Sequence, residues 1–291
     1  MTTSNIVLLG GPDTGKTNFI ARLWAAIRND ESTLRLSEIP NEIKYVEEQI
    51  NHLNQGHFAP RTDKNVVTEQ CSITIPLASP KAVQGKSRLE LVIPDVSGEI
   101  WKSAVETREI DRERMRQLEE ATGAIVFVRV LSDQNVSPPD WVNLANLMHL
   151  QEGADLGQIP TQVMLCEFVR FLELRLSVAR QIYRPRVAVV VTAWDLLDAK
   201  LRETNPRNYL EQEYPLFAGR LADVSHRFEV EIFSMSILGG DLKSDEEFRD
   251  KLLDDGLRNK GYVRFKRGEE IQESPDLGIP IAWAIHQDTI Y

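Results

Sequence analysis

The sequence predicts an α/β fold of three layers, with helices on both faces of a mostly parallel sheet. Short continuous apolar runs recur along the chain, and stretches with helical spacing of apolar residues lie between them. The runs cover residues 6–9, 124–130, 187–191 and 230–233. Such runs are typical of parallel strands that are buried on both faces. Together with a hairpin of two further strands, they predict a six-stranded sheet with one antiparallel edge strand and several helical insertions.

The bulk composition describes an ordinary globular chain. Its 291 residues are enough to bury a full core, and 42% hydrophobic with 27% charged residues is typical of globular proteins. The net charge of −10 argues against nucleic acid as a main partner, because phosphate backbones require a basic face. No apolar run approaches a membrane span, and the short N-terminus leaves no room for a signal peptide. The chain has two cysteines, Cys71 and Cys166, and both stand in apolar stretches, as is typical of reduced, buried thiols. We therefore expect a cytoplasmic protein.

We expect one domain over residues 1–291, interrupted by insertions. The insertions and a C-terminal helix are predicted at about 30–60, 131–160, 240–275 and 278–288. Between 43 and 53, apolar residues are three or four apart, which predicts an amphipathic helix in the first insertion. Ser244 and Glu247 fit a capping box at the start of a charged helix. Pro280 suits the first position of the last helix.

A glycine-rich loop follows the first apolar run. Residues 10–17 read Gly-Gly-Pro-Asp-Thr-Gly-Lys-Thr, which has the Walker A spacing. Glycines let successive N–H groups point at a polyphosphate, Lys16 can bridge the outer phosphates, and Thr17 can coordinate Mg²⁺. A glycine turn without a chemical role is the alternative, but a strand before and a helix after the loop favour nucleotide binding. The residues that we expect to form this part of the site are Gly10, Asp13, Thr14, Gly15, Lys16, Thr17 and Asn18.

A predicted hairpin leads to a second motif. Apolar residues alternate over 67–77 and again over 89–93, which indicates two paired strands. Asp95-Val96-Ser97-Gly98-Glu99 follows the second strand. An acidic residue at a strand end, with a glycine three residues on, is a spacing that senses the terminal phosphate of a nucleotide. Asp95 would hold Mg²⁺ through water, and the Gly98 N–H would bond the γ-phosphate. An ordinary turn is the alternative.

A third motif stands at the carboxyl end of the run 187–191, where open α/β sheets bind ligands. It reads Thr192-Ala193-Trp194-Asp195. A carboxylate here can accept hydrogen bonds from N1–H and the 2-amino group of guanine, whereas adenine offers no such pair of donors. We therefore expect Asp195 to read the base, with Thr192 and Trp194 beside it; capping of the next helix is its alternative role. Residues 234–236 would form a loop over the base and bring Ser236 to it.

With these motifs in this order, the chain resembles P-loop GTPases of the Ras-like, translation-factor-related class. It looks most like the bacterial double-GTPase or Rab-like GTPase proteins, which carry long insertions, and the resemblance covers about residues 5–236. It implies a P-loop NTPase fold that binds GTP or GDP with Mg²⁺. It also implies a threonine of the first switch that coordinates Mg²⁺; Thr62 fits best, and Thr68 is the alternative. The implied catalytic residues are Lys16, Thr62, Gly98 and Glu99, and the implied Mg²⁺ ligands are Thr17, Thr62 and Asp95.

The sequence departs from that family pattern at three places. Ala193 stands where family members have a lysine that packs along the base. Glu99 stands where a Ras-like protein has the glutamine that positions water, and a carboxylate near a triphosphate predicts slow hydrolysis. Pro12 stiffens the phosphate loop, and the Asp13 side chain must point away from the phosphates.

These features together predict a GTP-binding switch that hydrolyses GTP with Mg²⁺. Thr62, Ile100 and Trp101 are the candidate contacts to a protein effector or regulator, because they lie in or beside the nucleotide-sensing segments. An ATPase or nucleotide kinase on the same scaffold is one alternative. A protein that binds nucleotide without hydrolysis is the other, favoured by Ala193 and Glu99.

Overall fold

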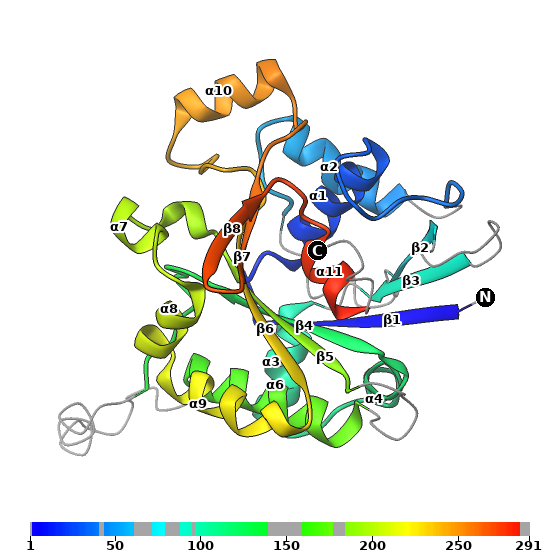
Figure 1. Cartoon of the computed structure of the whole chain (residues 1–291), viewed down its shortest axis with the longest axis vertical. Coiled ribbons are helices and arrows are strands. Elements are labelled where there is room, and N and C mark those ends of the chain that lie inside the picture. The colour runs from blue at the N-terminus through cyan, green and yellow to red at the C-terminus, as the bar shows by residue number, and fades with distance from the viewer. Residues whose placement is uncertain are drawn as a thin grey trace.

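The computed structural model of the chain describes residues 2–40, 44–60, 72–78, 88–94, 97–138, 159–176 and 184–285. In these ranges one sheet of eight strands runs through the molecule, with helices on both of its faces (Figure 1). The spatial order of the strands is β2-β3-β1-β4-β5-β6-β7-β8. The strands are β1 (Thr2–Leu9), β2 (Ser72–Ala78), β3 (Arg88–Pro94), β4 (Gly123–Arg129), β5 (Arg186–Thr192), β6 (Glu229–Ser236), β7 (Tyr262–Arg267) and β8 (Glu270–Ser274).

The strand directions confirm the predicted α/β fold. Strands β3, β1, β4, β5 and β6 are parallel to one another, and β2 closes one edge in the antiparallel direction. The sheet has two strands more than predicted, because β7 and β8 extend it beyond β6 as an antiparallel hairpin. Gly268 lies between these two strands with φ 63°, a conformation that a tight hairpin turn requires and that glycine adopts without strain. The sequence alone predicts an insertion, at about 240–275, where this hairpin lies.

The helices divide into two groups, one on each face of the sheet (Figure 1). One apolar core joins the sheet to α1, α2 and α11, and a second joins it to α3, α4, α6, α8 and α9. In β1, Ile6 and Leu8 belong to the first core, while Val7 and Leu9 belong to the second, as alternation along a strand requires. The helices are α1 (Lys16–Arg28), α2 (Lys44–Asn54), α3 (Gly98–Thr107), α4 (Arg112–Glu120), α6 (Thr161–Arg175), α7 (Ala199–Arg202), α8 (Pro206–Glu213), α9 (Pro215–Asp223), α10 (Glu246–Asp255) and α11 (Ile279–Ala284).

The predicted helices of the insertions are largely present. Helix α2 confirms the amphipathic helix, with Val46, Ile50 and Leu53 buried. Helix α11 begins around Pro280 as expected; residues 286–288 of the predicted helix, much of the insertion 131–160, and Cys71 lie outside the described residues. The predicted capping box is wrong by one residue. Asp245 caps α10 by accepting a bond of 2.9 Å from the Phe248 N–H, while the Ser244 hydroxyl donates to Asp241.

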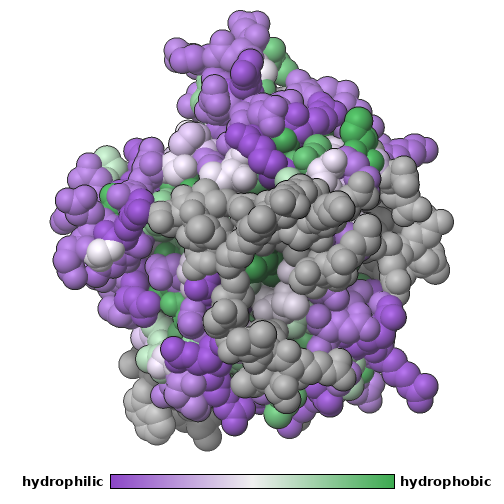
Figure 2. All heavy atoms as spheres, turned by 45° about the vertical axis from the view of Figure 1, so that its right-hand side comes forward, coloured by the Kyte–Doolittle hydropathy of each residue, from purple (hydrophilic) through white to green (hydrophobic). Residues whose placement is uncertain are grey.

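The surface in view is mostly polar. Figure 2 shows hydrophilic residues over most of the face that the described residues form, with small apolar areas between them. In the described ranges, no helix is both long and apolar enough to cross a membrane.

A buried ion pair ties helix α1 to two distant segments. The guanidinium of Arg22 is fully buried and donates to Glu31 at 2.9 Å and to the Lys260 carbonyl at 2.7 Å. Glu31 also accepts a bond of 3.1 Å from the Asn259 N–H. Burial lowers the pKa of Arg22, and the bond to Glu31 opposes that shift. This cluster therefore fixes the helix that follows the glycine-rich loop against the segment that precedes β7.

We expect Arg22→Ala to lower the free energy of unfolding by about 3–5 kcal/mol, because it leaves the Glu31 carboxylate buried without its cation. Arg28→Ala on the same helix is the matched control, since the Arg28–Glu47 pair is about half exposed on both sides and is worth less than about 1 kcal/mol. Urea unfolding of both variants measures the difference. Equal losses of unfolding free energy in the two variants would show that burial of the Arg22–Glu31 pair adds no stability.

Candidate functional site

A cleft of about 830 Å³ opens at the carboxyl ends of the parallel strands, and this volume suits a small-molecule site. The glycine-rich loop and the start of α1 form one side. The segment before β2, the start of α3, the turn after β5 and the segment after β6 form the others. Its lining residues are 12–18, 56–60, 97–99, Arg129, Thr192, Ala193, Asp195, Leu196, Ser236, Ile237 and 240–243.

The glycine-rich loop has the shape of an anion cradle. Gly15 precedes α1 with φ 85°, so that the first helical N–H groups and the positive end of the helix dipole face the cleft. The buried Lys16 ammonium donates to the carbonyls of Gly10 at 2.7 Å and Gly11 at 3.0 Å. Thr17 lines the cleft beside it. Gly10 therefore supports the loop through its carbonyl, while Lys16 and Thr17 stand where a phosphate would bind.

Three further residues of this stretch hold the loop itself or the segments next to it. The Asn18 side-chain oxygen accepts a bond of 2.9 Å from the Ala59 N–H, which fixes residues 56–60 against α1. The Thr14 hydroxyl donates to the Gly11 carbonyl and stabilises the loop itself. The Asp13 carboxylate lies 3.7 Å from Arg129 Nε and accepts a bond of 3.3 Å from the Ser132 hydroxyl.

The start of α3 packs directly on the glycine-rich loop. A Cβ on Gly98 would lie 2.3 Å from the carbonyl carbon and oxygen of Gly11, so only glycine fits there. Ser97 caps the helix by accepting a bond from the Glu99 N–H, and Glu99 lines the cleft. Asp95 lies outside the described residues, as does Thr62.

Trp101, an expected partner contact, is instead a core residue in this structure. Its side chain is fully buried, its Nε1–H donates to the Leu8 carbonyl at 3.1 Å, and its ring meets Phe168 edge to face. Because α3 begins at Gly98, position 101 lies one turn into the helix and faces the sheet. Ile100 is partly exposed and packs against the same core.

The motif at residues 192–195 brings Thr192 and Asp195 to the cleft, as expected. The Thr192 hydroxyl donates to the Thr14 carbonyl at 3.0 Å and so ties β5 to the glycine-rich loop. Asp195 lines the cleft, and the cap of α7 is Asp198, whose carboxylate accepts from the Leu201 N–H. The alternative role of Asp195 as that helix cap is therefore excluded. Burial raises the pKa of Tyr262 to about 12, and the nearby Asp195 carboxylate adds to the shift.

Trp194 does not reach the base side of the cleft. It is fully buried, donates from Nε1 to the Arg202 carbonyl at 3.0 Å and packs edge to face on Tyr209. Ala193 adopts φ 57°, and the 3₁₀ turn Trp194–Leu196 directs the indole into the core behind the cleft. The spacing of the motif in the sequence does not show that Trp194 turns into the core while Asp195 faces the cleft.

The expected loop at residues 234–236 is the end of strand β6 instead. Ser234 is fully buried, and Ser236 lines the cleft while its hydroxyl accepts a bond of 2.8 Å from the Gly239 N–H. The loop begins at Ile237, so the residues that cover this side are 237 and 240–243, which the sequence analysis missed. The Gly239-Gly240 pair is the turn signal that marks this later loop.

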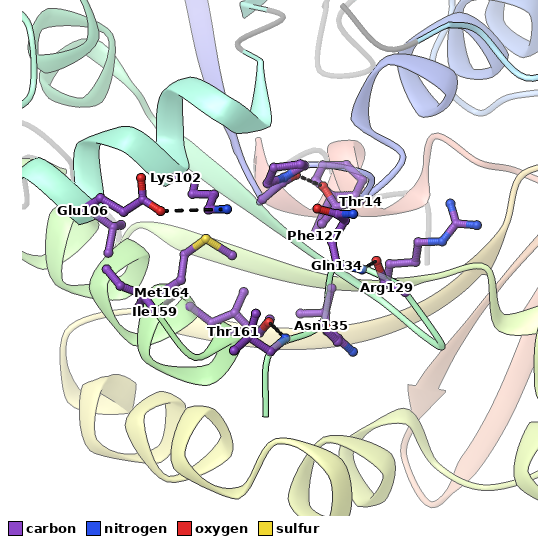
Figure 3. Close-up of a pocket in the computed structure, with 17 residues that line it drawn as sticks. Thr14, Lys102, Glu106, Phe127, Arg129, Gln134, Asn135, Ile159, Thr161 and Met164 are labelled. Atoms are coloured by element: carbon purple, nitrogen blue, oxygen red, sulfur yellow. Dashed lines mark hydrogen bonds and ion pairs between the residues drawn. The ribbon is translucent and has the colours of Figure 1, made fainter. Parts of the chain in front are cut away.

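A second, much smaller pocket lies behind the glycine-rich loop (Figure 3). It measures about 40 Å³ and is bounded by the loop, α3 and α6. Lys102 and Glu106 of α3 form an ion pair of 3.8 Å on one side, and Met164 of α6 points between the helices. This volume holds a few water molecules at most, so the larger cleft is the candidate nucleotide site.

Comparison with known proteins identifies the family. No curated protein matches the chain at a significant level. The family model of Double-GTPase 1 matches residues 7–284, which includes the glycine-rich loop, the start of α3 and the motif at the end of β5. With nearly its whole length matched, the chain belongs to the Double-GTPase 1 family and is a P-loop GTPase of the double-GTPase type.

Proposed function

We propose that this protein is a cytoplasmic, Mg²⁺-dependent GTPase that acts as a switch. The observation that carries the proposal is that Asp195 and the phosphate loop line one cleft. The Thr192 hydroxyl links the two by its bond to the Thr14 carbonyl. One ligand that carries both a base and a polyphosphate can therefore contact both ends of the site.

Guanine is the base that this arrangement favours. The Asp195 carboxylate accepts hydrogen bonds and donates none, so it suits the paired N–H donors of guanine and repels the ring nitrogens of adenine. An ATPase or nucleotide kinase would need a different role for the Asp195 carboxylate. Capping of α7 is not that role, because Asp198 caps this helix.

The phosphate end of the cleft suits a polyphosphate with Mg²⁺. Lys16 and the N-terminus of α1 offset phosphate charge, and the Thr17 hydroxyl is a candidate Mg²⁺ ligand. In this proposal Asp95 and Thr62, which lie outside the described residues, complete the metal's ligands. Held by these residues, Mg²⁺ would supply positive charge against the negative charge that develops during phosphoryl transfer.

Hydrolysis is expected to be slow because of Glu99. Glu99 lines the cleft in the first turn of α3, next to Gly98, whose N–H is the proposed sensor of the γ-phosphate. A carboxylate at this place is repelled by a triphosphate and cannot donate a hydrogen bond to it. A protein that binds GTP without hydrolysis is therefore the second candidate function.

The switch itself would involve the turn before α3 and the residues around Thr62. A γ-phosphate that bonds Gly98 would hold this turn, and release of phosphate would free it. Ile100, partly exposed beside the turn, is the candidate contact to a protein effector or regulator.

The direct test is calorimetric titration of the nucleotide-stripped protein with GTP, GDP and ATP in Mg²⁺, followed by phosphate release over hours. We expect guanine-selective binding with slow release, and no binding by Lys16→Ala, which removes the cation of the phosphate loop. Selective binding without release would identify the non-hydrolysing alternative. ATP preference, or full turnover by Lys16→Ala, would contradict the proposal.

We expect Asp195→Asn to weaken GDP binding about 100-fold, because charge-assisted hydrogen bonds to guanine are lost. The variant should bind XDP better than the wild type does, since xanthine carries a carbonyl in place of the amino group. Asp198→Asn, three residues on and at the cap of α7, should leave GDP affinity unchanged. Competition binding with GDP and XDP measures both; an unchanged preference in Asp195→Asn would remove this residue from base recognition.

We expect Gly98→Ala to abolish GTP hydrolysis while GDP still binds. The added methyl would lie 2.3 Å from the Gly11 carbonyl, and relief of that overlap moves the start of α3 away from the phosphate loop. Gly219→Ala is the matched control, because a Cβ at Gly219 in α9 meets no atom within 4 Å. Single-turnover phosphate release reports the effect, and wild-type rates in Gly98→Ala would disprove the sensor role.

A further inference from the structure

The carboxyl ends of β4 and β5 support the glycine-rich loop together. Arg129 and Thr192 are register partners in these strands and are therefore side by side. Thr192 donates to the Thr14 carbonyl at 3.0 Å, and Arg129 Nη1 donates to the Asp13 carbonyl at 3.4 Å. Two successive carbonyls of the loop are thus held by two neighbouring strand ends.

Arg129 also faces the Asp13 side chain. Its Nε lies 3.7 Å from the Asp13 carboxylate, and both side chains are about one quarter exposed, at 23% and 25%. The Nε atom itself is shut off from solvent and has no hydrogen-bond partner within the described ranges. A shift of less than about 1 Å would bring it to hydrogen-bond distance of that carboxylate. The two charged groups are therefore in contact, although Nε does not yet form a hydrogen bond to the carboxylate.

The charges around the cleft indicate what the contact between Arg129 and Asp13 does. Among the described residues that line it, Lys16, Arg129 and Lys243 are cationic, while Asp13, Glu99, Asp195 and Asp241 are anionic. Asp13 is the anion inside the glycine-rich loop, where it would repel a polyphosphate unless a cation offset it. Arg129 is the cation in contact with Asp13.

We propose that Arg129 is a positioning residue of the nucleotide site, which offsets the charge of Asp13 and holds the phosphate loop in its binding shape. The inference rests on the proposed nucleotide binding. It assigns to β4 a role that neither the Walker A motif nor the base-reading motif contains.

Arg129→Gln tests the role, because glutamine keeps much of the side chain and removes the charge. We expect GDP binding in Mg²⁺ to weaken about 10- to 100-fold by calorimetry, as loss of a charge-assisted contact predicts. Arg186→Gln is the matched control: Arg186 begins β5 at the far end of the sheet and pairs with Glu229 at 2.8 Å. It should lower the melting temperature without changing GDP affinity.

A second variant separates charge compensation from a general loss of structure. Adding Asp13→Asn to Arg129→Gln removes the uncompensated carboxylate. We therefore expect the double variant to bind GDP at least about tenfold more tightly than Arg129→Gln does. A purely structural role for Arg129 would leave the double variant as weak as the single one. Binding by Arg129→Gln within threefold of wild type, or no recovery in the double variant, would overturn the inference.

The wild type is measured first, so that the two proposals are tested separately. Wild-type binding of GDP with an unaffected Arg129→Gln variant contradicts only the role of Arg129. A wild type that binds ADP in place of GDP overturns the guanine assignment, and the same variants are then compared with ADP. A wild type that binds neither nucleotide overturns both proposals.

Discussion

The cleft depends on the buried ammonium of Lys16. A charge removed from water is costly unless polar partners surround it, and the carbonyls of Gly10 and Gly11 supply these at 2.7 and 3.0 Å. The loop must curl to present both carbonyls, which brings the N-terminus of α1 to face the cleft. Arg129 and Thr192 hold the carbonyls of Asp13 and Thr14 from the sheet side. The shape of the loop is thus set by four contacts to its backbone carbonyls.

The start of α3 is packed tightly against this loop. Gly98 contacts the Gly11–Pro12 backbone so closely that no side chain fits between them. One turn later, Trp101 is anchored in the core and bonded to Leu8 of β1, the strand that leads into the loop. The start of α3 is therefore held at Gly98 by the glycine-rich loop and at Trp101 by the core.

The segment after β6 completes the side of the cleft on which Asp195 lies, and the hairpin β7–β8 extends the sheet next to β6. Tyr262 of β7 lies close enough to the Asp195 carboxylate for the charge to contribute to its raised pKa. The buried Arg22–Glu31 pair joins α1 to the segment just before this hairpin. The phosphate side and the base side are consequently connected through the core as well as through the cleft.

The sequence by itself determined the fold class, the order of the core elements and the family, because buried parallel strands and a glycine-rich loop leave strong local signals. It also placed Lys16, Thr17, Gly98 and Asp195 at the ends of strands or starts of helices, where sheet topology brings them to one edge. Only the tertiary structure decided that Trp101 and Trp194 face the core, that Ser234 belongs to a strand and that Arg129 contacts Asp13. The direction of a side chain depends on helix starts and turns that shift by single residues. A contact between Arg129 and Asp13, 116 residues apart, is created by the parallel pairing of β4 with β1, which no local pattern encodes.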